Sequence, residues 1–188
     1  MRVTGKSKKR IIDKDIREIF TAEILSLTIA IIAGIILSVV IEKIYLIPAL
    51  LILLPGFLEL KGNITGSLSA RLGTALHTRK IKPEIRYTDF IRQNILADLF
   101  LTIFISLILG LLAYGLTYIV FNSSNPEIIL ISLVAALLAV VILIPLTFFS
   151  SFWLFKHGYD PDDIMGPYIT HIGDVVSIAS ILLVVMLL

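Results

Sequence analysis

The stretch IILISLVAALLAVVILIPLTFFSSFWL, residues 128–154, decides the fold class, because its 27 residues include no charged side chain. A helix needs about 20 mostly apolar residues to cross the hydrocarbon of a bilayer. Pro145 lies inside the stretch and predicts a kink or a local loosening, since proline cannot donate its backbone hydrogen bond. The stretch is therefore predicted to be a membrane-spanning helix.

The composition of the whole chain agrees with a membrane protein. Of its 188 residues, 57% are hydrophobic and 16% are charged, and the mean hydropathy is +0.99. Soluble domains are about 45–50% apolar and about 25% charged, and small domains leave much of their surface in water. The chain therefore needs membrane lipid as a partner. It has no cysteine, which excludes disulfides and thiolate metal sites.

Four further stretches are long enough to span a bilayer, which predicts an all-α, polytopic membrane protein with five transmembrane helices. They are residues 20–41, 44–72, 94–120 and 167–188. The second of them is apolar only to Leu54, and its remainder is too polar to face lipid. Between the second and third spans, Pro83 predicts a turn into a short surface helix. We divide the chain into a basic N-terminal segment, residues 1–19, and a five-helix transmembrane domain, residues 20–188.

The distribution of basic residues predicts the orientation. Seven of the sixteen Lys and Arg residues lie between Arg2 and Arg17, five more lie between residues 79 and 92, and Lys43 alone falls in a connection on the other side. Because short cytoplasmic segments carry the excess of Lys and Arg, we expect a cytosolic N-terminus, a C-terminus outside, and the plasma membrane as the location. A basic run can also touch nucleic acid, but before an apolar helix it marks the cytosolic side, so no nucleic-acid partner is expected. The first apolar run is too long for a cleavable signal.

The fifth span carries a carboxylate deep in the membrane. Asp174 lies about 10 Å along the helix from Pro167, at about 1.5 Å per residue, and shares a face with Thr170 at spacing i, i+4. Asp162 or Asp163 is expected to cap this helix. Charges inside hydrocarbon persist only where they are paired or wetted, and this span contains no Lys or Arg. Asp174 is therefore predicted to be functional, whereas His171 is expected to be a packed polar residue.

The second span supplies a matching polar stripe. Its small residues, which recur every fourth position and allow close helix packing, are Gly62, Gly66, Ala70 and Thr74. Non-helical backbone at this depth is tolerated only against protein or water, so both polar helices are expected to be broken or to present small residues, as ion sites in membrane proteins do.

The charged residues near this stripe can also have structural roles that involve no ion. One interpretation is that Lys61 balances the charge of Glu59, although residues two positions apart on a helix do not face each other. Asp98, near the start of the third span, is expected to pair with Lys61 or Arg92, with a pore role as the alternative. Arg71 is expected to reach the interface by snorkelling.

The candidate ligands are all oxygen donors. We expect the metal ligands to be Asp174, Asn63, Thr170 and Glu59, and the pore-lining residues to be Gly62, Ser67, Gly166 and Asp98. Without cysteine or a histidine pair at ligand spacing, zinc and copper are disfavoured. Mg²⁺ keeps most of its waters and needs only one or two carboxylates. Mg²⁺ is thus the expected transported ion, and the type of ligand does not exclude Mn²⁺ or Ca²⁺.

Two separated motifs resemble a known family. They are Pro55-x₆-Gly62-Asn63 with Ser67-x-Ser69-Ala70-Arg71-Leu72, and Gly158-x-Asp160-Pro161-Asp162-Asp163 with Gly166-Pro167-x-x-Thr170-x-x-x-Asp174. Both resemble MgtE-type magnesium transporters, and most of all their eukaryotic solute-carrier relatives. The resemblance implies a homodimer that is not an enzyme, with a divalent-cation pathway lined by the second and fifth helices near the two-fold axis. It implies that Asp174 is the key acid and Asn63 the pathway asparagine, in either a channel or an ion-coupled exchanger.

The alternatives come from other classes of protein. An intramembrane aspartyl protease would use Asp98 and Asp174, but its Gly-x-Gly-Asp motif requires glycine at position 171, which is His171 here. Asp98 also lacks the tyrosine that precedes the partner aspartate in such enzymes. A membrane assembly subunit that carries no ion is the third reading.

Overall fold

The computed structural model describes residues 5–45, 47–84, 86, 88–123 and 125–187, with the side chains of 5–15, 40 and 42–45 left aside, and these residues form five α-helices and no strand. The helices are α1 (Gly5–Tyr45), α2 (Pro48–His77), α3 (Asp89–Phe121), α4 (Glu127–Lys156) and α5 (Pro161–Leu187). All five contain a stretch long and apolar enough to cross a membrane. The expectation of an all-α, polytopic membrane protein is confirmed.

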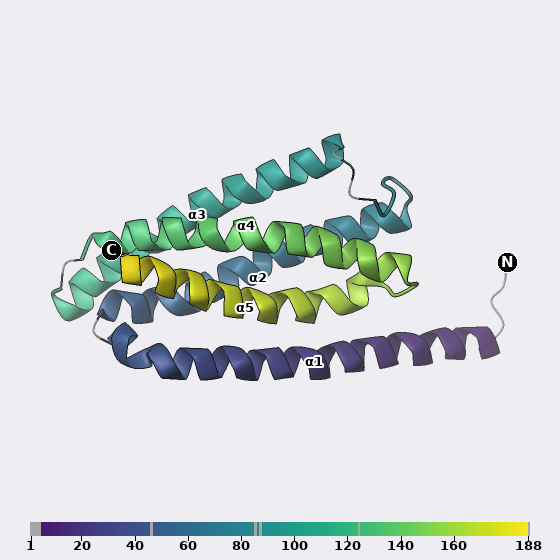
Figure 1. The fold of residues 1–188 in the computed structure, drawn as a ribbon, viewed down its shortest axis with the longest axis horizontal. Coiled ribbons are helices and arrows are strands. Elements are labelled where there is room, and N and C mark those ends of the chain that lie inside the picture. Colours follow the sequence, from purple (N-terminus) through teal and green to yellow (C-terminus); the bar gives the residue numbers. More distant parts are fainter. Residues whose placement is uncertain (1–4, 46, 85, 87, 124, 188) are drawn as a thin grey trace.

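The helices run up and down in an elongated bundle (Figure 1). The start of α1, the α2–α3 connection and the α4–α5 connection lie at one end, while the other two connections and the C-terminal end of α5 lie at the opposite end. Within the bundle, α2 contacts α3, α4 and α5, whereas α1 packs mainly against α5. The two polar spans, α2 and α5, are therefore direct neighbours.

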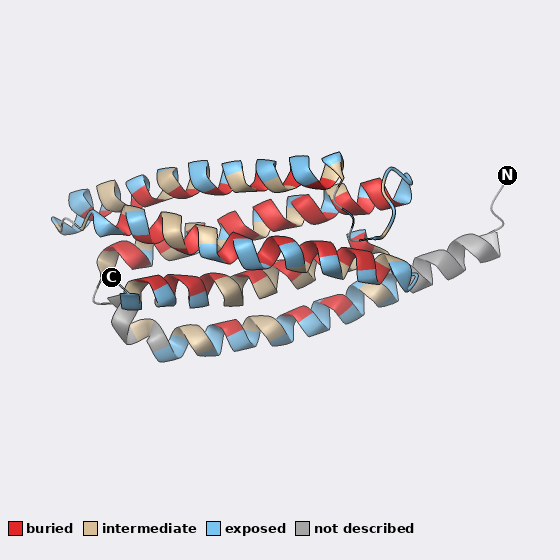
Figure 2. Cartoon of the chain, turned by 45° about the horizontal axis from the view of Figure 1, so that its top comes forward, coloured by how far each residue is buried: buried red, intermediate tan, exposed pale blue. Residues whose placement is uncertain are grey.

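The core lies between α2, α4 and α5. Figure 2 shows the buried residues concentrated on the sides of these helices that face one another, while α1 and α3 are exposed along much of their outer surface. Ala135, Ala136 and Ala139 of α4 are fully buried, because small side chains let neighbouring helices approach closely. Large apolar side chains such as Phe100 and Ile119 stay exposed, as expected of surfaces that meet lipid.

The start of α5 differs from the expectation. The helix begins at Pro161, six residues before Pro167, because a carboxylate oxygen of Asp160 accepts a hydrogen bond of 2.9 Å from the backbone N–H of Asp162. The expectation that Asp162 or Asp163 caps the helix is therefore wrong. Pro161 is tolerated at the first position of the helix, because an N–H at this position would have no partner within the helix.

The short surface helix expected after Pro83 is also absent from the described part of the α2–α3 connection, which forms turns and bends. Its backbone hydrogen bonds are local, such as the bond of 2.7 Å from the N–H of Glu84 to the carbonyl of Lys82. Such short-range bonds close turns and do not propagate a helix.

Neither polar helix is broken, so of the two arrangements expected from the sequence only the small-residue one is found. α2 continues through Pro55 and through Gly62–Asn63, and α5 continues through Pro167. A Cβ atom placed on Gly62 would lie 3.4 Å from Cγ2 of Thr170. The absence of a side chain at Gly62 thus brings the backbone of α2 into contact with α5.

Candidate cation site

The second half of α2 has an exposed face that is largely polar. Between Glu59 and Thr74 the exposed residues follow one another at steps of three or four, and they are Glu59, Asn63, Ser67, Ala70 and Thr74. We call these five residues the α2 stripe. The other side of the helix is buried, with Leu60, Ile64 and Leu68 in the core beside the polar residues Lys61, Thr65 and Ser69. At helical spacing one face of α2 therefore holds the bundle together, and the other presents oxygen donors.

Side chains of α5 meet this stripe half-way along the bundle. Asp174 is thirteen residues from Pro161 and thirteen from Leu187, or about 20 Å from each end at 1.5 Å per residue. On α2, Asn63 is fifteen residues from Pro48 and fourteen from His77. Both residues therefore lie near the middle of helices that are long enough to span a bilayer.

The polar groups at this level interact with one another. The side-chain amide of Asn63 donates a hydrogen bond of 3.0 Å to Oε1 of Glu59, and the carboxylate of Glu59 lies near enough to repel that of Asp174. Nδ1 of His171 lies 3.4 Å from Oδ2 of Asp174. The side chains of His171 and Asp174 are 26% and 23% exposed. Within the described part of the chain, the carboxylate of Asp174 is thus partly open, and its hydrogen-bond contact is the long one to His171.

Thr170 adds a hydroxyl to this group. Its Oγ1 donates a hydrogen bond of 2.9 Å to the backbone carbonyl of Gly166, which leaves its lone pairs able to accept. The arrangement brings together two carboxylates, one amide and one hydroxyl. These are oxygen groups of the kind that bind Mg²⁺ through its waters or directly.

A family model described as "Divalent cation transporter", MgtE, matches residues 54–184, more than half of the chain. The chain belongs to the MgtE family. No curated protein matches it. The match begins within α2 and ends near the end of α5, so it includes every side chain of the group around Asp174. As a member of the MgtE family, the chain is a divalent-cation transporter of the multi-pass membrane type.

The intramembrane protease is not supported for this MgtE-family chain. In such a site two aspartates act together, and like charges at close range share a proton. Here Asp98 is ion-paired with Arg71, at 2.7 Å between Oδ1 and Nη2, whereas the neighbours of Asp174 are His171 and Glu59. The two aspartates have separate environments.

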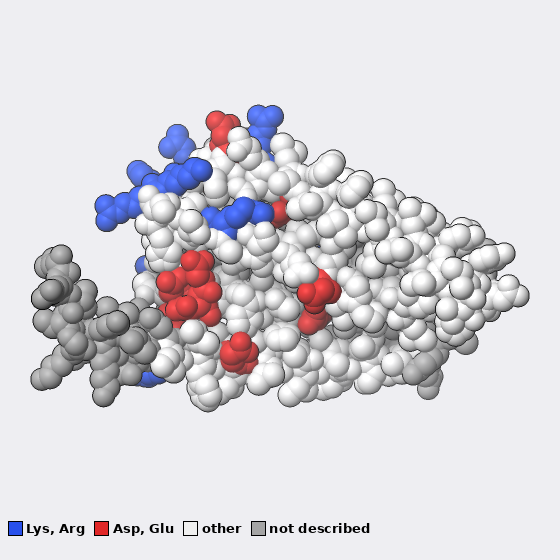
Figure 3. Space-filling model, turned by 180° about the vertical axis from the view of Figure 1, so that it is seen from behind, with Lys and Arg blue, Asp and Glu red and all other residues white. Residues whose placement is uncertain are grey.

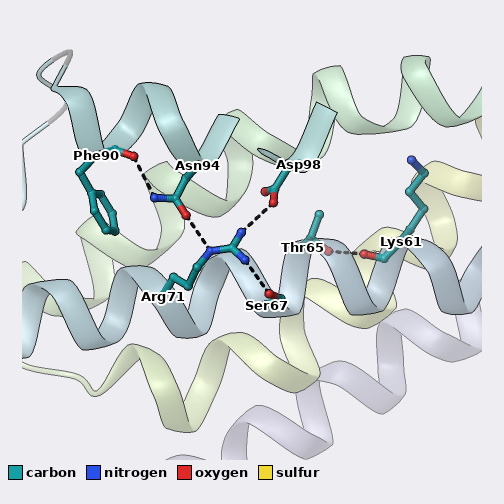
Figure 4. Close-up of polar contacts among 7 residues, drawn as sticks. All are labelled: Lys61, Thr65, Ser67, Arg71, Phe90, Asn94 and Asp98. Carbon is teal, nitrogen blue, oxygen red and sulfur yellow. Dashed lines mark hydrogen bonds and ion pairs between the residues drawn. The ribbon is translucent and has the colours of Figure 1, made fainter. Parts of the chain in front are cut away.

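The pairings expected for the charged residues around the site are corrected. Asp98 pairs with Arg71 rather than with Lys61 or Arg92, and Arg71 reaches into the bundle rather than out to the interface (Figure 4). Lys61 does not contact Glu59. It is fully buried, and its ammonium donates a hydrogen bond of 2.7 Å to the backbone carbonyl of Ala136.

A second group of possible ligands was not found from the sequence. His77, Asp160 and Asp162 place their ligand atoms within 4.8 Å of one another where α2 ends and α5 begins. Glycine at position 73 makes room there, because a Cβ atom would overlap Oδ1 of Asp162. In the sequence, the feature that could have indicated this group was the run Asp160-Pro161-Asp162-Asp163. Nothing in the sequence indicates that His77 lies beside it.

Acidic and basic side chains are unevenly distributed over one face of the molecule. Figure 3 shows Lys and Arg gathered at one end of the molecule, while acidic side chains form separate groups on the same face and reach towards its middle. Among the described residues, the charged side chains seen on this face lie away from its opposite end. The charge on this face therefore changes from mixed at one end to only acidic at mid-length.

Proposed function

We propose that this MgtE-family chain carries Mg²⁺ across the plasma membrane along a path lined by α2 and α5 of two copies. One observation carries the proposal: Asp174, Glu59, Asn63 and Thr170, from two neighbouring helices, lie together at mid-depth on a face that is open in the single chain. Gly62, Ser67 and Gly166 extend the path along the same two helices.

Asp174 attracts and orients the hydrated ion. A carboxylate in a partly dry environment interacts with a divalent ion several-fold more strongly than in bulk water. Mg²⁺ dehydrates reluctantly and keeps several waters, so Asn63 and Thr170 accept hydrogen bonds from those waters and need not replace them. Glu59 adds a second negative charge, which favours divalent over monovalent cations, and Mn²⁺ and Ca²⁺ are competing ions.

A second copy of the chain covers the open face. Each charge left in hydrocarbon costs at least about 2.5 kcal/mol, and the α2 stripe with Asp174 would place two carboxylates against lipid if the chain were alone. A two-fold axis beside α2 and α5 removes both from lipid and doubles the acidic ligands. This supports a homodimer with a wet path at its centre.

Orientation follows from the basic end of the molecule. The start of α1 and the α2–α3 connection, with its Lys and Arg residues, lie at the same end of the bundle, and an excess of such residues marks the cytosolic side. We therefore place the start of α1 in the cytosol and the C-terminus outside. Asp98 is left out of the path because its side chain is fully buried.

The test is Mg²⁺ uptake into liposomes that contain the purified protein. Asp174→Asn keeps the size of the side chain and removes its charge, and uptake is expected to fall at least about a hundredfold. The matched control is Asp89→Asn, because Asp89 is exposed in the first turn of α3, and it should transport as the unchanged protein does. Uptake by Asp174→Asn at the level of this control would refute the proposal.

A further inference from the structure

Arg71 places a positive charge beside the proposed cation path. It follows Ser67 by one helical turn on α2, and its side chain is 38% exposed. Its Nη1 donates a hydrogen bond of 2.8 Å to the hydroxyl of Ser67, a member of the α2 stripe. Because Ser67 is four residues beyond Asn63, the guanidinium lies about 6 Å along the axis from the level of Asn63.

The other donors of this guanidinium turn towards α3. Nε donates a hydrogen bond of 2.6 Å to Oδ1 of Asn94, and Nη2 donates one of 2.7 Å to Oδ1 of Asp98 (Figure 4). Both acceptors are buried, and the amide of Asn94 is itself fixed by a hydrogen bond of 2.8 Å to the carbonyl of Phe90. The guanidinium is thus held in one place by α2 and α3 together.

A fixed cation beside the path would oppose the transported ion. Its repulsion of a divalent cation is twice that of a monovalent one, and the stripe itself offers only neutral groups at this level. Asp98 supplies the missing negative charge. It contacts Arg71 through one oxygen, and its Oδ2 has no hydrogen-bond partner among the described residues.

We propose that Asp98 is a positioning residue for transport, which cancels the charge of Arg71 and holds it towards α3, so that the Arg71–Asp98 pair sets the rate at which divalent cations pass Ser67. This rests on the proposed function of the α2 and α5 face. A pair that only joined α2 to α3 would affect folding and leave transport by the folded protein unchanged.

The decisive variant is Asp98→Asn. The amide oxygen can still accept from Nη2, and Asn94 and Ser67 still hold the guanidinium, so the geometry is kept and only the negative charge is lost. We expect Mg²⁺ uptake to fall about tenfold, and the deficit to shrink when inert monovalent salt is raised from about 0.05 to about 0.5 M, because salt screens the exposed charge. The double variant Asp98→Asn/Arg71→Gln removes both charges and should recover uptake to within about threefold of the original.

A second pair of variants avoids the buried carboxylate. Ser67→Lys adds an unpaired positive charge on the exposed stripe, and Ser67→Gln adds a neutral side chain of nearly equal length. The lysine variant should lose about tenfold in uptake relative to the glutamine variant. This comparison stands even if Asp98→Asn does not fold.

Three results would overturn the inference: uptake by folded Asp98→Asn equal to that of the original, a double variant as slow as the single one, or equal uptake by the two Ser67 variants. Failure of the proposed function is separate from these. It would appear as absence of Mg²⁺ uptake by the unsubstituted protein, whereas the inference can fail while that protein transports normally.

Discussion

Asp98 and Asp174 are both aspartates inside membrane-spanning helices, yet their surroundings are opposite. Asp98 is fully buried and meets the guanidinium of Arg71 at 2.7 Å. Asp174 is partly exposed and lies near the like charge of Glu59, and its one possible cationic contact among the residues described is His171, at 3.4 Å. Asp98 has a close cationic partner inside the single chain, and Asp174 has none as close among the described residues.

Under the proposed function, this difference separates an acid that joins two helices from an acid that meets the transported cation. An intramembrane charge persists when a partner or water compensates for its desolvation. Asp98 has that partner within the chain. Under the proposed function, a divalent cation supplies this compensation for Asp174.

The largest expected effect is a difference in the free energy of unfolding between variants of the two aspartates. Asp98→Ala leaves Arg71 without its counter-charge and should lower the free energy of unfolding by about 2 kcal/mol, less than for a fully buried pair because Arg71 is partly exposed. Asp174→Ala should change it by no more than about 0.5 kcal/mol. Unfolding in detergent, followed by circular dichroism, measures both. Equal losses would remove the distinction between a structural and a functional acid.

Next in size is the effect of Glu59→Gln on transport. Glu59 adds charge beside Asp174 and is bonded to Asn63, so its neutral replacement keeps the hydrogen bond and weakens only the attraction for the cation. Uptake of Mg²⁺ at low concentration should fall about tenfold. Glu127→Gln is the control, since Glu127 is exposed in the first turn of α4. If uptake does not change, Glu59 is not part of the cation site.

The smallest effect is expected at His171. A contact of 3.4 Å is long for a hydrogen bond, so His171→Gln should change uptake by less than about threefold. His157→Gln, at the end of α4, serves as the control. A loss of uptake above about tenfold would instead indicate that His171 is a ligand. Asp174 would then have a close partner, as Asp98 does.

Much of the fold follows from the sequence because lipid imposes simple rules. The apolar run from Ile128 to Leu154 can be read as a span from its composition alone. The ends of helices are harder to predict, since they depend on single contacts. Asp160 rather than Asp162 caps α5, and Pro167 lies inside a helix that it was expected to begin.

The contacts of the candidate site likewise include some that can be predicted from the sequence and others that cannot. Thr170 and Asp174 share a face because they are four residues apart, so their proximity is readable from the sequence. Arg71 and Asp98 are 27 residues apart, and Lys61 reaches the carbonyl of a residue 75 positions away. Such pairs depend on how each helix is rotated about its axis in the bundle, which is set by packing over whole faces and not by spacing.

The odd number of spans has a consequence for protein engineering. The start of α1 and the end of α5 lie at opposite ends of the bundle, so with five crossings they are expected on opposite sides of the bilayer. A tandem gene that joins two copies through a short hydrophilic linker would therefore insert the second copy upside down. A fusion that keeps both halves parallel needs one additional hydrophobic segment in the linker to return the chain to its starting side.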